Sequence, residues 1–167
     1  MARERVALHR DLREVVYSSE RFALLARKRA RAAEFLELSP PGTRVFGSVA
    51  RGDVRPASDI DLEVPFGSAS FAVEVALGRL AEPWNERRLV QATPNAVVKA
   101  LWDFGEVTVA LPLTRPNPIE EAFTRFGGAV DREQLGRGER VPGVDKRLLL
   151  IEPTPHGHRE SSVADRV

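Results

Sequence analysis

The chain contains no cysteine, one methionine and only three lysines among its 167 residues. The absence of cysteine excludes disulfide bonds, thiolate zinc sites and cysteine nucleophiles. No apolar run approaches the roughly 20 residues that a membrane-spanning helix needs. The N-terminal region is charged throughout and lacks the apolar core of a secretory signal. We therefore expect a cytoplasmic protein without a membrane contact.

A strong charge of one sign is also missing. Lysine and arginine together number 25, aspartate and glutamate 24, and the net charge is +1. This balance argues against the global positive field of a dedicated nucleic-acid binder. The basic run at residues 27–31 still leaves a DNA-binding regulator open, although a solvated helix face is the simpler interpretation. A chain of this length, 43% hydrophobic, is long enough for one domain with a real core.

The first part of the chain has a helical pattern. Residues 3–38 contain no glycine or proline and place apolar side chains among many charges, which predicts one or two amphipathic helices. The serine pair at 18–19 offers a break and an N-cap near the middle. The sequence SPPG at 39–42 then ends the helix.

The rest of the chain alternates between strand and helix patterns. We expect strands at 44–46, 60–64, 88–91, 106–111 and 147–152, helices at 71–80, 94–103 and 116–126, and a loop with a frayed tail at 153–167. This order predicts an α+β or α/β fold, with a small mixed sheet flanked by helices. We place the main domain at 1–113 and a C-terminal extension of unknown role at 114–167.

Two acidic residues in the second expected strand point to a metal site. Successive side chains of a strand face opposite sides, so Asp59 and Asp61 share one face while Ile60 and Leu62 occupy the other. Two carboxylates about 4 Å apart repel by roughly 4 kcal/mol at an effective dielectric near 20. A divalent cation removes this cost, and hard oxygen ligands suit Mg²⁺ or Mn²⁺ with substrate phosphates.

The Gly47-Ser48 pair supplies the complementary half. A glycine after a short strand lets the backbone come close to a ligand, and a helical turn over residues 49–51 would direct N–H groups at an anion. The Ser48 hydroxyl, with Arg51 and Arg55 nearby, adds donors for phosphate oxygens. Phosphate binding and metal binding are thus expected about ten residues apart.

These two halves resemble the signature of the nucleotidyltransferases of the DNA polymerase β superfamily. That signature is Gly-Ser, a spacer of about this length, then Asp-x-Asp, and the matching stretches are FGSVARGD at 46–53 and SDIDL at 58–62. The form is especially similar to the minimal nucleotidyltransferases, some of which are paired with HEPN-domain partners in toxin–antitoxin modules. It is also similar to the catalytic domain of aminoglycoside nucleotidyltransferases.

The resemblance implies a polymerase-β-like nucleotidyltransferase fold and an activity. The enzyme would bind an NTP such as ATP and transfer its NMP to a hydroxyl of a protein side chain, a small molecule or an RNA end, with release of pyrophosphate. Asp59 and Asp61 would hold Mg²⁺ or Mn²⁺, and Gly47, Ser48, Arg51 and Ser58 would form the nucleotide-binding part. The alternative is a catalytically weak or inactive binding module, an antitoxin-like partner of a HEPN-type protein.

The superfamily normally adds a third carboxylate from a neighbouring strand. Glu63 lies about 13 Å from Asp59 along the strand, too far to share a site with both aspartates. We expect Glu106 to complete the catalytic and metal-binding set. If Thr108 occupies the acidic position instead, that carboxylate is missing. Asp103 is less favoured, because the helix expected at 94–103 and a glycine separate it from the strand.

Other motifs are weaker. Residues 42–48 have the glycine spacing of a P-loop but lack its lysine. No G-x-S-x-G motif of a serine hydrolase occurs. His156 and His158 are spaced to share a metal ion but lack an evident third ligand, and a flexible polar loop is the favoured interpretation.

Overall fold

The structure is a computed structural model that describes residues 12–166. Residues 3–11 of the expected N-terminal helical segment lie outside this range. The described strands are β1 (Arg13–Val16), β2 (Arg44–Phe46), β3 (Ile60–Glu63), β4 (Glu86–Val90), β5 (Lys99–Asp103), β6 (Val107–Pro112), β7 (Ala129–Asp131), β8 (Gly143–Val144), β9 (Leu149–Thr154) and β10 (Gly157–Ser162). The helices are α1 (Ser19–Leu38), α2 (Gly47–Arg51), α3 (Ser70–Leu77), α4 (Pro118–Phe126), α5 (Arg132–Gly136) and the 3₁₀ turn η1 (Val163–Arg166).

A six-stranded mixed sheet forms the centre of the molecule, with strand order β4-β5-β6-β3-β2-β7. Strands β3 and β6 pair in parallel, and the other neighbours pair antiparallel. The sheet with its flanking helices confirms the predicted α+β class. Strand β7 comes from the expected C-terminal extension, so that extension contributes to the central sheet.

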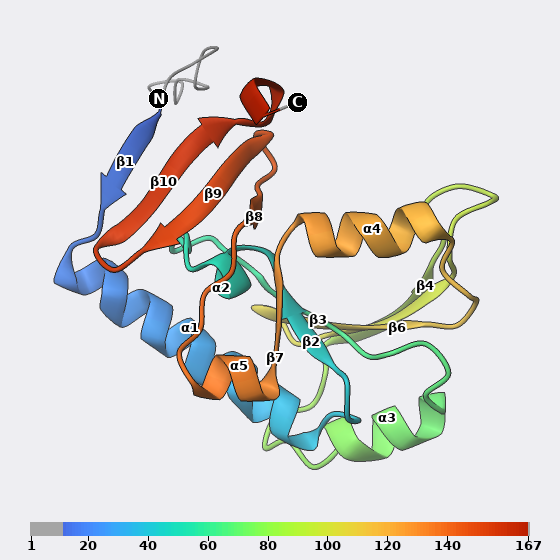
Figure 1. Ribbon diagram of the computed structural model, residues 1–167. Helices are drawn as coiled ribbons and strands as arrows, with labels where there is room; N and C mark the ends of the chain where they lie inside the picture. Colours follow the sequence, from blue (N-terminus) through green and yellow to red (C-terminus); the bar gives the residue numbers. More distant parts are fainter. Residues whose placement is uncertain (1–11, 167) are drawn as a thin grey trace.

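The two faces of this sheet differ in polarity. Alternate residues of β3 and β6 are fully buried on one face, where they pack against α1 and α3; they are Ile60, Leu62, Val107, Val109 and Leu111. Figure 1 shows α4 on the other side of the sheet. The face toward α4 carries Asp61 and Glu63 of β3. The core therefore lies on one side, and the polar face is left for a site.

The N-terminal strand and the chain end build a second, antiparallel sheet of order β1-β10-β9-β8 (Figure 1). Two predictions are therefore wrong: residues 13–16 form a strand rather than a helix, and residues 157–162 form a strand rather than a frayed tail. The helical pattern of the first segment gave no indication of a partner more than 140 residues away. The polar composition of β10 concealed a strand in which His158 and Glu160 are buried and 3.1 Å apart.

The helix predicted at 94–103 is also wrong, because residues 99–103 form β5. Pro94 and Gly105 have the placement of helix boundaries, but the apolar residues follow a two-residue period. Ala100 and Trp102 are buried while their neighbours are partly exposed, as in a strand. Tertiary pairing with β4 and β6 therefore overrides the local boundary signals.

Several local predictions are confirmed. Helix α1 begins after an N-cap at Ser18, whose side chain accepts a hydrogen bond from the Arg21 backbone N–H, and it ends at Leu38 before the SPPG sequence. Strands β2, β3, β4, β6 and β9 and helices α3 and α4 overlap the expected ranges.

Candidate functional site

A cleft of about 720 Å³ lies on the polar side of the central sheet. This volume is within the range of small-molecule sites. Its lining combines the α2 region, the loop before β3, the C-terminal end of α4 and the turn between β8 and β9; the residues include Gly47, Ser48, Arg51, Ser58, Asp59, Asp61, Phe123, Phe126, Lys146 and Leu148. The structure therefore brings both predicted halves of the site into one cleft.

The Gly-Ser turn begins α2. Gly47 has φ 67°, a left-handed conformation that favours glycine, and its N–H donates to the Gly128 carbonyl at 3.0 Å. A Cβ at Gly47 would meet no atom within 4 Å, so the backbone here borders open space. The N-cap residue Phe46 makes no capping hydrogen bond, and the half-buried Ser48 lines the cleft. Glycine is therefore favoured at position 47 by the backbone conformation and not by a lack of space for a side chain.

Both aspartates open onto the cleft. Asp61 lies in β3 and Asp59 immediately before it. Desolvation by the surrounding protein raises the pKa of Asp61, and the negative charge of Asp59 raises it further, whereas Lys146 lowers it. The carboxylate at 61 is therefore held in an environment where a further positive charge is favourable.

Glu106 pairs with Lys28 and is not among the residues that line the cleft. It accepts a hydrogen bond from the Lys28 ammonium at 2.5 Å, which lowers the pKa of Glu106, and it does not line the cleft. Lys28 lies on the core side of α1, is 1% exposed and also donates to the Ser58 carbonyl at 2.6 Å. Among residues 12–166, no three His, Asp or Glu side chains are grouped to hold a metal ion. Asp59, Asp61 and Glu106 are therefore not grouped in this way, and the catalytic role expected for Glu106 stays a prediction.

The strand register shows which residue lies beside Asp61. In the parallel pair of β3 and β6, Asp61 lies opposite Thr108, and Thr108 lies opposite Asp103 across β5. The position beside Asp61 on the neighbouring strand is therefore a threonine. Asp103 shares this face of the sheet, contrary to the separation expected from a helix, but it accepts from the Gly105 N–H at 2.6 Å and does not line the cleft.

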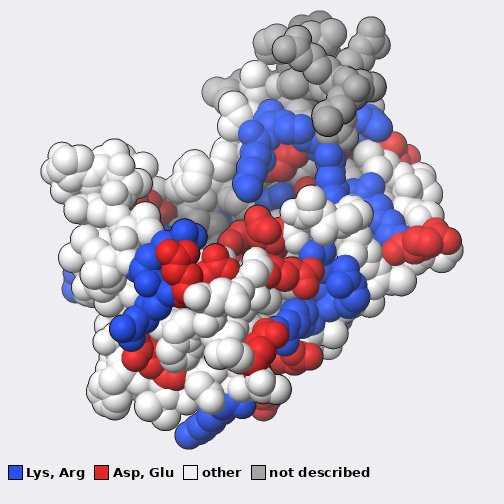
Figure 2. All heavy atoms as spheres, turned by 180° about the vertical axis from the view of Figure 1, so that it is seen from behind, with Lys and Arg blue, Asp and Glu red and all other residues white. Residues whose placement is uncertain are grey.

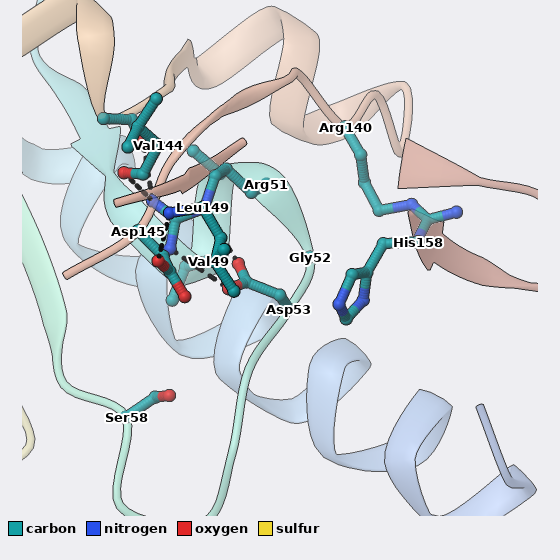
Figure 3. A network of polar contacts seen from close by, with 12 residues as sticks. Val49, Arg51, Gly52, Asp53, Ser58, Arg140, Val144, Asp145, Leu149 and His158 are labelled. Atoms are coloured by element: carbon teal, nitrogen blue, oxygen red, sulfur yellow. Dashed lines mark hydrogen bonds and ion pairs between the residues drawn. The ribbon is translucent and has the colours of Figure 1, made fainter. Parts of the chain in front are cut away.

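Arg51 is held by the protein itself (Figure 3). It is 6% exposed, and its guanidinium pairs with both carboxylate oxygens of Asp53 at 3.0 and 3.1 Å. It also donates to the carbonyls of Gly127 at 2.6 Å and Val144 at 3.4 Å. Arg51 therefore ties α2 to the end of α4 and to β8, which makes it a positioning residue. Its predicted contact with phosphate is untested.

Ser58 closes the turn before Asp59. Its hydroxyl accepts from the Arg55 N–H at 2.9 Å, and its own N–H donates to the Arg55 carbonyl at 2.9 Å. The Lys28 ammonium holds the Ser58 carbonyl from the core side. In Figure 3 the Ser58 side chain stands apart from the Arg51 cluster. Ser58 thus fixes the backbone that carries Asp59 into the cleft.

Lys146 was not predicted as a site residue, and the turn between β8 and β9 brings it to the cleft. Asp145 shapes this turn: its carboxylate accepts from the backbone N–H groups of Arg147 and Leu149 at 2.9 and 3.1 Å. Leu148 is the one non-glycine residue of the described chain with positive φ, at 61°. The sequence feature that could have drawn attention to Lys146 is the rarity of lysine: the chain has three lysines and 22 arginines, 25 basic residues in all.

A series of buried polar contacts leads from Tyr17 to Arg147, in the turn between β8 and β9. The Tyr17 hydroxyl lies 3.0 Å from the Gly52 carbonyl and 2.6 Å from His158 Nδ1, and His158 Nε2 lies 3.1 Å from Glu160. Glu160 in turn accepts from Arg147 at 2.8 Å. Burial raises the pKa of Tyr17 to about 12 and lowers that of His158. His158 is thus a buried strand residue, and the flexible loop predicted around it is wrong for this position.

The basic run of α1 is largely engaged within the protein. Lys28 binds Glu106, Arg29 donates to the Val49 carbonyl, and Arg31 pairs with Glu34 and Glu82. On the face shown in Figure 2, basic and acidic side chains are interspersed rather than gathered into one basic field. These contacts disfavour a DNA-binding role for this run.

The fold and the cleft together define a class of protein: an α+β domain that presents a Gly-Ser turn and an Asp-x-Asp pair to one ligand site. The family model described as "Nucleotidyltransferase domain" matches residues 28–117, more than half of the chain. The chain belongs to this family, whose general activity is nucleotidyl transfer. No curated protein matches the chain. No helix within residues 12–166 combines the length and apolar character needed to cross a membrane.

Proposed function

We propose that the protein is a metal-dependent nucleotidyltransferase that moves an NMP from an NTP to a hydroxyl acceptor and releases pyrophosphate. One observation carries the proposal: Gly47, Ser48, Asp59 and Asp61 all line the same cleft of about 720 Å³. In this reaction the acceptor oxygen forms a bond to the α-phosphorus. The bond from that phosphorus to the bridging oxygen of the β-phosphate breaks, pyrophosphate leaves, and the hydroxyl proton passes to solvent water.

Asp59 and Asp61 fit a divalent cation by their chemistry. They are hard oxygen donors on one cleft, and the pKa of Asp61 is raised by burial and by the adjacent negative charge, an environment that a cation relieves. Bound Mg²⁺ or Mn²⁺ would supply charge neutralisation of the triphosphate and activation of the acceptor oxygen. Asp59 and Asp61 would hold this cation in the cleft that receives the triphosphate.

The remaining residues of the cleft have separate roles in this proposal. Gly47 and Ser48 would offer backbone and hydroxyl donors to the β- and γ-phosphates. The Lys146 ammonium would stabilise the negative charge that develops on pyrophosphate. Arg51 would not contact the ligand itself but would position the cleft, because its contacts with Asp53, Gly127 and Val144 hold the cleft walls together.

A second candidate follows from the register of β3 and β6. Since Thr108 rather than an acid lies beside Asp61, the same cleft suits a nucleotide-binding module with weak or no transfer activity. Such a module would act through a partner, as in the antitoxin-like pairing with a HEPN-type protein. The near-neutral net charge leaves a protein side chain or a small molecule favoured over a long nucleic acid as the acceptor.

The two candidates differ in one assay. Purified protein is incubated with Mg²⁺ or Mn²⁺, each NTP labelled at the α-phosphate, and candidate acceptors, including HEPN-type proteins. We expect label transfer that falls by about 100-fold or more in Asp59→Asn and Asp61→Asn, the scale seen when one group that stabilises a transition state is lost.

Glu106→Gln is the matched control, because it makes the same change of carboxylate to amide outside the cleft. It should retain most of the transfer. Equal loss in all three variants would restore Glu106 to the catalytic set. Metal-dependent NTP binding without label transfer to any acceptor would favour the binding module.

A further inference from the structure

Helix α4 presents unusual apolar exposure. None of its residues is buried, and Ile119 and Phe123 are 79% and 74% exposed. The helix is nevertheless firmly placed: Asn117 and Glu120 form a capping box, and Glu120 also accepts from the Val97 N–H at 2.8 Å. The exposed aromatic side chains of α4 therefore stand on an anchored element.

Two of these side chains form one wall of the cleft. The rings of Phe123 and Phe126 lie with centroids 6.4 Å apart and planes inclined by 29°, in a stacked arrangement. Both line the cleft, together with Leu148, which is 66% exposed in the turn between β8 and β9. Ile119 belongs to the same helix but does not line the cleft. The aromatic wall, defined here as Phe123 and Phe126, is thus specific to the ligand side of α4.

The aromatic wall adjoins the Gly-Ser turn. Directly after Phe126, the Gly127 carbonyl accepts from Arg51 at 2.6 Å, and the Gly128 carbonyl accepts from the Gly47 N–H at 3.0 Å. A ligand with its phosphates at Gly47 would therefore have apolar ring surface within the same cleft. A nucleotide has this division, with a charged phosphate end and a flat aromatic base.

We propose that the aromatic wall of Phe123 and Phe126 is the base-binding subsite, on which the nucleobase of the donor NTP stacks. This inference rests on the proposed function and adds the residues that bind the base. Stacking uses the π-face that every base possesses and is tolerant of base identity. The protein therefore accepts all four NTPs with similar affinity.

The experiment compares two ligands that differ by the base and sugar. Binding of ATP and of inorganic tripolyphosphate, each with Mg²⁺, is measured by calorimetry for the wild type, Phe123→Ala, Phe126→Ala, Phe123→Tyr and the control Ile119→Ala. We expect Phe123→Ala to weaken ATP binding by roughly tenfold or more while tripolyphosphate binding stays unchanged. Phe123→Tyr keeps the ring and the ATP affinity, and Ile119→Ala changes neither ligand.

Several results overturn the proposal. ATP affinity that is unchanged in both Phe123→Ala and Phe126→Ala means that the rings meet another occupant, such as a partner protein. Equal weakening of ATP and tripolyphosphate means that α4 only shapes the cleft. A wild type that binds both ligands equally well refutes the base contact alone, whereas a wild type that binds neither refutes the proposed function as well.

Discussion

The surroundings of Asp61 in the cleft shift the pKa of its carboxyl in both directions. Desolvation and Asp59 raise the pKa of this carboxyl, while the charge of Lys146 lowers it. Lys146 therefore stabilises the ionised form of Asp61, an effect that we had expected only from a bound metal ion. The strand register puts Thr108 rather than an acid beside Asp61, and Lys146 lines the same cleft as Asp59 and Asp61.

His158 provides a prediction for pH. Its folded pKa is lowered from 6.5, chiefly by desolvation, so the native protein favours the neutral ring. Its contribution to stability is present above pH 6.5 and is lost as the pH falls through the folded pKa, because the unfolded chain takes up the proton more readily. We expect the free energy of unfolding, from urea titrations between pH 7.5 and 5.5, to fall more steeply in the wild type than in His158→Gln.

The other histidines do not affect the comparison between the wild type and His158→Gln. His9 and His156 remain in both proteins, so their contribution cancels in the comparison of slopes. Glu160 also faces His158, but its pKa is lowered below 4.5 and it titrates outside this pH interval. Parallel slopes for the two proteins would show that the buried ring does not control acid stability.

At the scale of elements, the turn between β8 and β9 connects the second sheet to the cleft. The backbone of this turn is fixed by the Asp145 carboxylate, and Glu160 of β10 holds Arg147 from behind. The second sheet therefore contributes an exposed lysine, Lys146, to the lining of the cleft.

We expect Lys146→Met to lower label transfer by roughly tenfold or more, because it removes the only ammonium that lines the described part of the cleft. Lys146→Arg, which keeps the charge, should retain more activity. Arg137→Met is the matched control, since it removes an exposed cation from the end of α5, outside the cleft. Transfer rates that are the same in Lys146→Met and the wild type would exclude a role for the lysine.

The elements also show what a sequence can reveal. The caps and stops of α1 and the Gly-Ser turn depend on neighbouring residues, and these local features were predictable. Strands β1 and β10 depend on a partner far along the chain, and nothing local distinguishes GHRESS from a loop. Asp59 and Asp61 could be paired from strand periodicity, whereas the contact of Glu106 with Lys28 required the packing of α1 against the sheet.

At the scale of the whole molecule, the division at residue 113 does not follow the packing. Strand β7 extends the central sheet, with Val130 fully buried, and Arg51 donates to carbonyls of Gly127 and Val144. Gly143 also approaches the backbone of Gly127 so closely that an added Cβ would lie 2.7 Å from it. The two parts of the chain share one core and one cleft.

We therefore expect a chain truncated after residue 113 to lose cooperative folding, because it lacks β7 and the partners of Arg51. Thermal unfolding followed by circular dichroism should show a sharp transition for the full chain and a broad or absent one for the truncated chain. A truncated chain that unfolds cooperatively and binds NTP as the full chain does would support an independent domain at 1–113.

The joint action of the two halves of the cleft is tested by metal-dependent nucleotide binding to the full chain. Calorimetry with each NTP, with and without Mg²⁺ or Mn²⁺, compares the wild type with Asp61→Asn. We expect NTP binding that strengthens with the metal in the wild type, and loss of that metal-dependent gain in Asp61→Asn. NTP binding that is absent, or that is indifferent to the metal in the wild type, would contradict the assignment of this cleft.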